Sequence, residues 1–444
     1  MSSSSVPDDG ARQSGITRRA VVSGALAMGI GAGLDQVIAK RPARTTVTHG
    51  AGAGAEPLKT PGESARAEQS ASFYGTHQAG ITTLAQEYMS FATFDLMTGA
   101  VEDLRAMLER WTAAAASLTV GRPYEPTPQR AGQPPLDPGE ATDLPPAQLT
   151  ITVGFGPSLF RKDGIDRFRL AGRKPSVLNP LPPFAGDQVL EDISGGDLCV
   201  QACANDPQVA FHAVHLLAKL AAGVARIRWS QVGFGRTAST SRIQVTTRNL
   251  MGFKDGTDNI RSEEQAVLER FVWVQPGDGP DWMAGGSYLV ARRIRILLDV
   301  WDATTLEEQE RTIGRDKRSG APLGRAREYD RVDLQATDAS GRLAIPANAH
   351  IRLANPHNND GQRILRRGYS YAEPVQPGSD QLDAGLFFIS FQRDPERQFI
   401  PLQARLAALD ALNRHTRVTS SSIFGCPPGA SEGGFLGEAL LAGV

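Results

Sequence analysis

The stretch DLCVQACANDPQVAFHAVHLLAKLAAGVARIRWSQVGF, residues 197–234, contains two predicted strands with a predicted helix between them. Its two ends, 197–204 and 226–234, are short apolar-rich segments of the kind that form strands. Asn205 or Asp206 is expected to cap the helix, because a side-chain oxygen there accepts hydrogen bonds from unpaired backbone N–H groups. A proline follows in the first turn and a glycine ends the helical pattern. The stretch therefore predicts the order strand, helix, strand.

The same order stands upstream of this stretch. Residues 90–96 and 149–155 are predicted strands, and residues 101–118 carry apolar side chains at helical spacing. Two consecutive units of strand, helix and strand form the pattern of a ferredoxin-like α+β domain, an antiparallel sheet with flanking helices.

The second half of the chain repeats the theme. Residues 288–300 and 386–392 are predicted strands, Thr305 starts a short helix through a capping box, and residues 395–412 form an amphipathic pattern. Residues 313–380 are rich in Arg, Gly and Asn and are expected to be mostly loop. A long polar insertion on a rigid scaffold suggests a ligand pocket built from loops.

These patterns predict three parts of the 444-residue chain: residues 1–55 as a leader and linker, and two ferredoxin-like domains at 56–245 and 246–444. The composition, 41% hydrophobic and 21% charged, is that of a soluble globular protein. A net charge of −1 gives no electrostatic basis for a nucleic-acid partner. The three cysteines rule out a disulfide framework and are expected to be small buried hydrophobic residues.

The N-terminus has the order of an export signal. Arg18 and Arg19 precede a weakly apolar run that ends at Gly33, followed by a linker rich in Pro, Gly, Thr and Ala. At about 1.5 Å per residue this run is too short to cross a hydrocarbon core of about 30 Å, so stable membrane insertion is not expected. The pattern predicts export by the twin-arginine route to the periplasm or the cell exterior, with cleavage after Ala39 or Ala55.

Among the histidines, His212 and His215 share one face of a predicted helix. No third ligand with matching spacing is nearby in sequence, so packing is favoured over metal binding. His77 and His415 lack an acid or cysteine partner in sequence. His350 differs, since it lies where a loop meets an alternating apolar segment, although a lone histidine beside apolar residues is more often a core residue.

The stretch MGFKDGTDN, residues 251–259, places Asp255 between Lys254 and Gly256. Asp-Gly is a common tight-turn dipeptide, because glycine accepts a positive φ without strain. A carboxylate in a polar run can also serve as a base, and the stretch alone leaves both interpretations open.

Taken together, these segments resemble the dye-decolourising (DyP-type) haem peroxidases, in particular the exported subtype also described as deferrochelatases. The pieces that carry the resemblance span most of the chain after the leader: FYGTHQAGI (73–81), FATFDL (91–96), VGFGPSLF (153–160), GDLCVQACANDPQVAFHAV (196–214), GFKDG (252–256), IGRDKRSGAPLG (313–324), AHIRLANP (349–356), ILRRGYSY (364–371) and GLFFISFQRDP (385–395). The resemblance implies two ferredoxin-like domains and one haem b per chain, held mainly by the C-terminal domain.

The resemblance also assigns roles to residues. His350, matched through AHIRLANP, would be the ligand of the haem iron, with an anionic partner on its other ring nitrogen, for which Asp383 is the candidate. Asp255, matched through GFKDG, would move a proton between the two oxygens of hydrogen peroxide. Arg366, the first arginine of ILRRG, would stabilise the charge that develops as the O–O bond breaks. Since a carboxylate accepts a proton only while ionised, activity should fall at low pH as Asp255 is protonated.

Further haem contacts follow from the same matched motifs. They are Gly256, Thr257 and Asp258 on one side, Asn355, Pro356 and His357 on the other, and Arg315 as a propionate partner. The resemblance leads us to expect Arg and Thr at positions 357 and 358, where this chain has His357 and Asn358. Surface aromatic residues that could relay electrons from large donors are Trp229, Trp273, Trp282, Trp301, Tyr369 and Tyr371, although ordinary packing is favoured for most of them.

The expected function is reduction of hydrogen peroxide coupled to oxidation of bulky aromatic donors such as dyes and phenolics. One alternative is a deferrochelatase, which releases iron from haem and leaves the porphyrin intact, with iron-uptake components as partners. A second alternative is a non-catalytic haem-binding protein, which would not need Asp255 and Arg366. Assembly into an oligomer is compatible with all three.

Overall fold

The computed structural model describes residues 70–127, 130–374 and 381–444. The expected twin-arginine signal, its cleavage positions and most of the linker lie outside these residues. Within the described ranges, no helix is long and apolar enough to cross a membrane.

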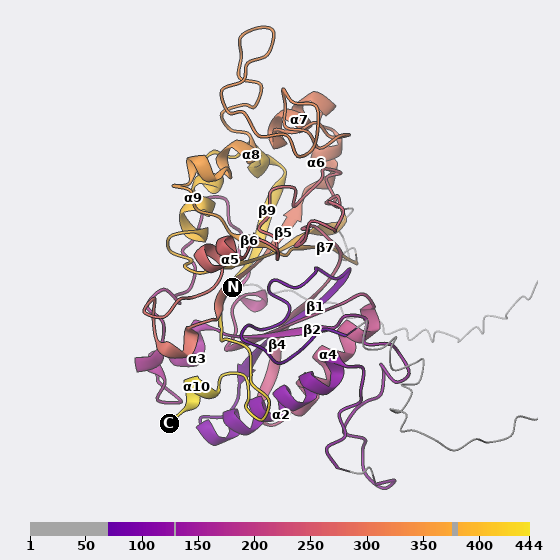
Figure 1. The fold of residues 1–444 in the computed structure, drawn as a ribbon, viewed down its shortest axis with the longest axis vertical. Helices are drawn as coiled ribbons and strands as arrows, with labels where there is room; N and C mark the ends of the chain where they lie inside the picture. The colour runs from indigo at the N-terminus through magenta and orange to yellow at the C-terminus, as the bar shows by residue number, and fades with distance from the viewer. Residues whose placement is uncertain (1–69, 128–129, 375–380) are drawn as a thin grey trace, which may run out of the picture. The chain divides into compact units, whose positions relative to one another are not determined.

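The N-terminal half is a four-stranded antiparallel sheet with two helices on its outer face (Figure 1). The strand order β2-β3-β1-β4 is that of a ferredoxin-like unit. Asp206 caps α4 by accepting hydrogen bonds from the N–H groups of Gln208 and Val209, as the sequence predicts. The elements are β1 (Tyr88–Leu96), α2 (Val101–Thr119), β2 (Thr150–Phe155), the short α3 (Pro157–Phe160), β3 (Leu198–Ala204), α4 (Pro207–Leu220) and β4 (Ala225–Arg236).

The C-terminal half repeats this arrangement. Its antiparallel order, β9-β5-β8-β7, is again ferredoxin-like, so the predicted fold class is confirmed. The main elements are β5 (Ser287–Ile296), α6 (Leu298–Asp302), α7 (Leu306–Ile313), α8 (His350–Leu353), β6 (Leu365–Arg366), β7 (Tyr369–Glu373), β8 (Asp383–Gln392), α9 (Phe399–Leu409) and β9 (Thr416–Cys426). Outside the repeat lie α5 (Gln265–Phe271) and α10 (Glu438–Leu441).

The two sheets join at both edges. Strand β4 pairs with β7, and β2 pairs with β9 through Phe155 and Gly425. A hydrophobic core lies between the sheets, where the Phe387 ring is 5.2 Å from Phe91 and 6.1 Å from Trp229. Each sheet therefore buries one face against the other sheet, while β4 keeps Ile227, Val232 and Phe234 exposed on its other face.

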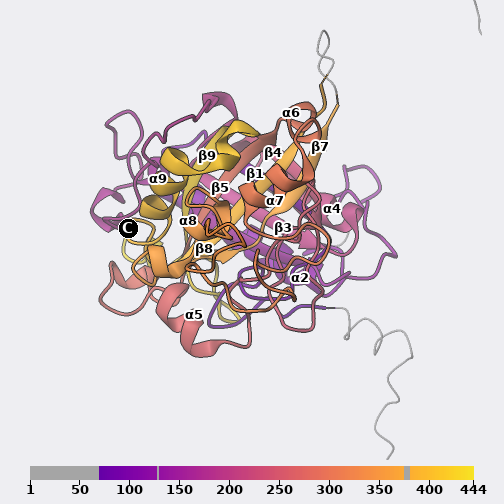
Figure 2. The ribbon, with the colours of Figure 1, turned by 90° about the horizontal axis from the view of Figure 1, so that it is seen from above.

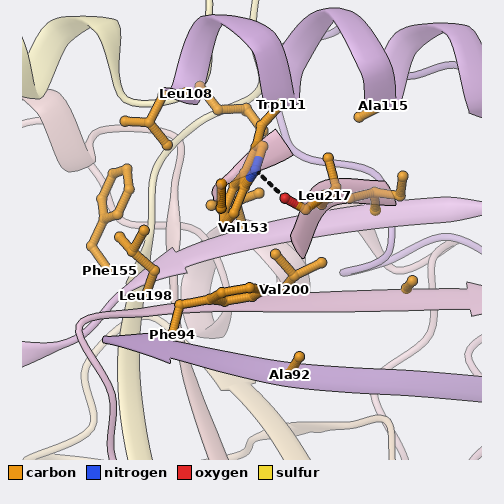
Figure 3. Packing of buried hydrophobic residues seen from close by; sticks show 14 of the residues in the cluster. Ala92, Phe94, Leu108, Trp111, Ala115, Val153, Phe155, Leu198, Val200 and Leu217 are labelled. Carbon is orange, nitrogen blue, oxygen red and sulfur yellow. Dashed lines mark hydrogen bonds between the residues drawn. The ribbon is translucent and has the colours of Figure 1, made fainter. Parts of the chain in front are cut away.

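A second core lies between the N-terminal sheet and its helices (Figure 3). Trp111 of α2 is buried against Phe94 of β1, with ring centroids 5.1 Å apart. Its indole N–H donates a 2.8 Å hydrogen bond to the carbonyl of Leu217 in α4 (Figure 3). This bond satisfies the one polar atom of a large buried side chain and ties the two helices together.

The structure corrects two predicted element boundaries and confirms one predicted helix cap. The strand predicted at 288–300 ends at Ile296, because residues 298–302 turn into α6, and the helix predicted at 395–412 spans only Phe399–Leu409. Thr305 does cap α7 by accepting a hydrogen bond from Glu308 N–H (3.3 Å). All three cysteines are buried and free, as expected.

Candidate active site

Asp255 is placed by a tight hairpin. Its N–H donates to the carbonyl of Thr247 (2.9 Å), and Gly252 adopts φ +82° at the turn. Gly256 follows with φ +90°, and a Cβ on it would lie 2.7 Å from Cα of Ala238. Glycine is thus required here both for the backbone conformation and for close approach to a neighbouring chain segment. The turn residues are 250–251 and 257–258, and Asp255 and Gly256 lie between them, so the prediction of a turn at the Asp-Gly dipeptide is wrong. The hairpin before Asp255 presents the acid.

The carboxylate of Asp255 pairs with Arg366. The guanidinium Nη1 lies 2.7 Å from Oδ1, and the amide of Asn249 donates to Oδ2 at 3.2 Å. The side chains are 17% and 29% exposed, so both reach open space while the pair is held. The structure therefore brings together the two residues that the sequence predicts for peroxide chemistry.

Asn259 holds the backbone of Arg366. Its side-chain oxygen accepts from Arg366 N–H (2.8 Å), and its amide donates to the carbonyls of Arg366 (2.8 Å) and Ser239 (3.1 Å). The Asn259 side chain is buried, so water cannot replace these bonds easily. Arg366 is thus fixed on one side by Asn259 and on the other by pairing of β6 with β8.

His350, the first residue of α8, is held by Asp410 at the end of α9. Its Nδ1 lies 2.6 Å from Oδ2 of Asp410, and the side chains are 33% and 3% exposed. The two helices lie side by side (Figures 1 and 2), and a backbone hydrogen bond from Ala411 N–H to the carbonyl of Asn348 (3.0 Å) joins the neighbouring residues.

The prediction that Asp383 is the partner of His350 is wrong. Asp383 lies at the start of β8 and pairs with Arg293 at 2.8 Å. Arg293 is a buried strand residue whose charge requires a partner, which explains why the acid is engaged there. The anionic partner that the resemblance calls for exists, but it is Asp410.

The charges of Asp410, Asp255 and Arg366 all act on His350. Burial alone would lower the pKa of His350, but the charge and hydrogen bond of Asp410 outweigh it, so this pKa is raised. The charge of Asp255 also raises the pKa of His350, and that of Arg366 lowers it. Within residues 70–127, 130–374 and 381–444, no hydrogen bond engages Nε2 of His350. That nitrogen is available as a metal ligand.

Arg315 and Glu328 lie beside this group. Burial lowers the pKa of Arg315, against the opposing charges of Asp258 and Glu328, and its Nη1 donates to the carbonyl of Gly320 (2.7 Å). Burial would raise the pKa of Glu328, but the Lys254 ammonium outweighs it and lowers this pKa.

The remaining predicted contacts are spread over two loops. Thr257 donates to Glu328 (3.1 Å), and the exposed Asp258 lies 3.4 Å from Arg363. Asn355, Pro356 and His357 follow α8, where the Asn355 side chain accepts from His357 N–H (2.9 Å) in a short 3₁₀ helix. These residues flank the site, and none of them pairs with Asp255 or Arg366 among the contacts of the described chain.

The aromatic residues predicted to lie at the surface are buried: Trp229, Trp273, Trp282, Trp301, Tyr369 and Tyr371. The expectation of surface exposure is therefore wrong, and the packing interpretation holds. His77, which has no acid partner in sequence, stacks on Trp273 with ring centroids 3.8 Å apart and contacts the carbonyl of Gly285 through Nδ1 (2.6 Å).

Sequence reasoning missed Asp410, Asn249 and Asn259. A signal existed for Asp410, since an acid at the C-terminal end of a helix opposes the helix dipole and calls for a cationic or hydrogen-bonded partner. Asn259 ends the stretch 251–259 and could have been weighed there. Asn249 carries no comparable signal.

Comparisons with known proteins show the family of the chain. A family model described as "Dyp-type peroxidase, C-terminal" matches residues 246–431, and one described as "Dyp-type peroxidase, N-terminal" matches residues 78–235. The chain is 40% identical over 389 residues to a dye-decolorizing peroxidase from Thermobifida fusca, covering 85% of this chain and 86% of that one. It is 38% identical over 375 residues to a deferrochelatase from Yersinia pseudotuberculosis, covering 83% and 84%.

Solved structures extend the likeness to three dimensions. A DyP-type peroxidase from Streptomyces coelicolor aligns with a TM-score of 0.78 and 40% identity, covering 87% of this chain and all 100% of that one. An oxyferrous complex of DtpA from Streptomyces lividans aligns with a TM-score of 0.76 and 41% identity, covering 84% and 97%.

Proposed function

Since this chain belongs to the Dyp-type peroxidase family, we propose that it binds one haem b and reduces hydrogen peroxide while oxidising bulky aromatic donors. The observation that carries the proposal is the hydrogen-bonded pair of Asp255 and Arg366, whose charges act on His350. Within the described residues, Nε2 of that histidine makes no hydrogen bond. The balanced reaction consumes one hydrogen peroxide, two protons and two electrons and yields two waters. Two donor molecules therefore each lose one electron.

The donor set fits a haem. His350 offers an imidazole nitrogen, and the carboxylate of Asp410 on its other nitrogen orients the ring and increases its basicity. His350 would hold the iron, and Arg315 is the candidate for a propionate. When bound, the haem iron supplies an open coordination position for peroxide and accepts and passes on electrons.

Asp255 and Arg366 perform the proton and charge steps. With haem bound, the carboxylate of Asp255 would accept a proton from one oxygen of hydrogen peroxide and return it to the other, so that this second oxygen could leave as water, with the two electrons for breaking the O–O bond supplied by the haem. Arg366 carries a permanent charge and stabilises the negative charge on the leaving oxygen. Asn249 and Asn259 keep both groups in place, so little reorganisation is needed during the reaction.

A second candidate activity, release of iron from haem with an intact porphyrin, is favoured by the relatives named deferrochelatase. It would use the same pocket, with His350 as the ligand. Export by the twin-arginine route is part of the proposal and is supported by Arg18, Arg19 and the apolar run after them.

The test compares the haem-loaded parent with Asp255→Asn and Arg366→Leu. We expect all three to retain haem and both variants to lose peroxide-dependent dye oxidation. Equal dye oxidation in parent and variants would contradict the assignment of the pair. Iron-free porphyrin formed in stoichiometric amount, without dye oxidation, would move the assignment to iron release. Haem that is bound but inert in all three proteins would indicate a carrier.

A further inference from the structure

A cavity of about 550 Å³ lies close to the edge at which β2 and β9 join the two sheets. Its lining comes from β1, α3, the segment 180–196, β4 and residues 421–423 of β9. His350, Asp255 and Arg366 are not among the residues that line it. In Figure 1, α3 lies toward the bottom of the molecule and α8, which carries His350, toward the top. Small-molecule sites are often found in cavities of this size at the junction of two domains.

Much of the lining is apolar. The apolar residues are Pro157, Pro180, Leu181, Pro182, Pro183, Val189 and Ile423. The proline rings are rigid, so they lose no side-chain entropy when a ligand packs on them. Val189 and its neighbour Leu190 are also exposed to solvent. Exposed apolar side chains beside a cavity are typical of a ligand-binding surface.

Arg228 lines the cavity with all three nitrogens of its guanidinium engaged. Nε donates to the carbonyl of Ser194 (2.8 Å), and Nη2 donates to the carbonyl of Glu191 (2.8 Å). Nη1 donates to Oδ2 of Asp95 at 3.3 Å. These bonds fix the group in its own plane, and the side chain is still 30% exposed. The face of the guanidinium is therefore the surface that it offers a ligand, and such a face stacks on aromatic rings.

Lys162 provides a hydrogen-bond donor for an anion. Its Nζ lies 2.9 Å from Oδ1 of Asp95 and 3.5 Å from Oδ2 of Asp197. An ammonium group has three donors, so one N–H is left for a ligand. Asp197 also pairs with Arg167 at 2.8 Å. The group thus has three cations, including Arg228, against two carboxylates, and its net charge is positive.

The remaining polar lining does not cancel this charge. Asp187, the other acid of the cavity, pairs with the buried Arg292. The hydroxyls of Ser158 and Ser421 take part in no hydrogen bond among the described residues, where only their backbone groups do. A free hydroxyl can donate to an anionic oxygen.

We propose that this cavity binds an aromatic molecule that carries one carboxylate or sulfonate group. The ring packs between the proline wall and the face of Arg228, and the acid group meets Nζ of Lys162 and the hydroxyl of Ser158. The positive charge favours an anion over a neutral or cationic molecule. A rigid ring also loses less conformational freedom on binding than an alkyl chain of similar size.

The experiment is equilibrium dialysis of the full-length, haem-loaded protein against anthraquinone sulfonate, without peroxide. We expect one molecule bound per chain. Lys162→Gln should weaken binding about tenfold, the value of one hydrogen bond to a charged group, and Lys162→Arg should restore it. Ser158→Asp adds a carboxylate to the wall and should weaken binding by at least about tenfold. Lys219→Gln, on α4 and outside the cavity, is the matched control and should bind like the parent.

Two further ligands test the assigned chemistry. Neutral hydroxymethylanthraquinone should bind Lys162→Gln and the parent equally well, and an equal loss of both ligands would contradict the role of the charge. Octanesulfonate should bind the parent at least about tenfold more weakly than anthraquinone sulfonate. Equal or tighter binding of the alkyl sulfonate would overturn the aromatic assignment.

His350→Ala separates this cavity from the haem site and should still bind anthraquinone sulfonate. Loss of binding in this variant would place the ligand in the haem pocket and overturn the proposal. Absence of stoichiometric binding by the parent would overturn it as well. Because dialysis requires no turnover, the result is independent of peroxidase activity.

Discussion

Replacing Asp410 by Asn tests whether the residue at the end of α9 holds His350, the proposed haem ligand. Oδ1 of Asp410 accepts from Leu412 N–H (2.9 Å), and Oδ2 contacts His350 Nδ1 (2.6 Å), so both oxygens are engaged. An amide has only one oxygen. If it stays with Leu412, its NH₂ faces His350 and drives the ring proton to Nε2, the nitrogen needed for iron. If it turns to His350, the Leu412 N–H loses its acceptor.

Loss of a partner that orients a metal ligand weakens metal binding by about 10–100-fold, or about 1.4–2.7 kcal/mol. We therefore expect Asp410→Asn to reduce haem affinity by this factor. Because Asp410 is only 3% exposed, water cannot easily supply the missing acceptor. Haem affinity is measured by titration of the haem-free protein, followed by the Soret absorption band.

The control is Asp383→Asn. Asp383 is the acid that the sequence analysis expected to contact His350, but it pairs with Arg293 instead. Its haem affinity should equal that of the parent, whatever happens to its stability. An Asp410→Asn variant with parental haem affinity would refute the reasoning, and so would an equal loss in Asp383→Asn.

The pH dependence of the stability of the haem-free protein gives a further test. The pKa of His350 is raised in the folded state, so the pair with Asp410 stabilises the fold most fully below the ordinary histidine value of about 6.5. This contribution is lost as pH rises through the folded-state value. Urea denaturation should therefore show a larger stability difference between parent and Asp410→Asn at pH 5 than at pH 8. An equal or reversed difference would contradict the assigned coupling.

Two further substitutions test how the backbone around Asp255 and Arg366 is held. Gly256→Ala places a Cβ 2.7 Å from Cα of Ala238 on a residue with φ +90°. This variant should lower the free energy of unfolding by about 1–3 kcal/mol, measured by urea denaturation. A decrease below about 0.5 kcal/mol would argue against a requirement for glycine at this position. Asn259→Ala keeps Arg366 but removes the side-chain hydrogen bonds to its backbone. We therefore expect kcat to fall while the KM for the aromatic donor stays unchanged. A rise in KM alone would contradict a positioning role for Asn259.

The fold could be predicted from the sequence wherever periodicity was strong. Residues 197–234 and 90–118 form the predicted strands and helices to within a few residues, because each has a clear period, cap or turn residue. The run 297–300 was misassigned, since a short apolar run is compatible with strand or helix. β9 was not predicted, because TRVTSSSIFGC begins with polar residues and gains its identity from pairing with β5.

The site was predictable only where a motif carried it. His350, Asp255 and Arg366 came from matched segments; the structure pairs the last two, and their charges act on His350. Asp410 lies sixty residues from His350 in the chain, and its contact depends on how α8 and α9 pack. The contacts of His212 with Asp137 and Glu140 could not be predicted for the same reason, because the packing of the segment before β2 on α4 sets them.

The central claim is that Asp255 and Arg366 activate hydrogen peroxide beside a haem that His350 holds. The most direct test mixes the haem-loaded parent, Asp255→Asn and His350→Ala with one equivalent of hydrogen peroxide and follows the Soret band on the millisecond scale. We predict a rapid spectral change in the parent, a slowing of about 10²–10⁴-fold in Asp255→Asn, and no normal Soret band in His350→Ala. A Soret band in the parent that does not respond to peroxide, or one that responds equally fast without Asp255, would contradict the account.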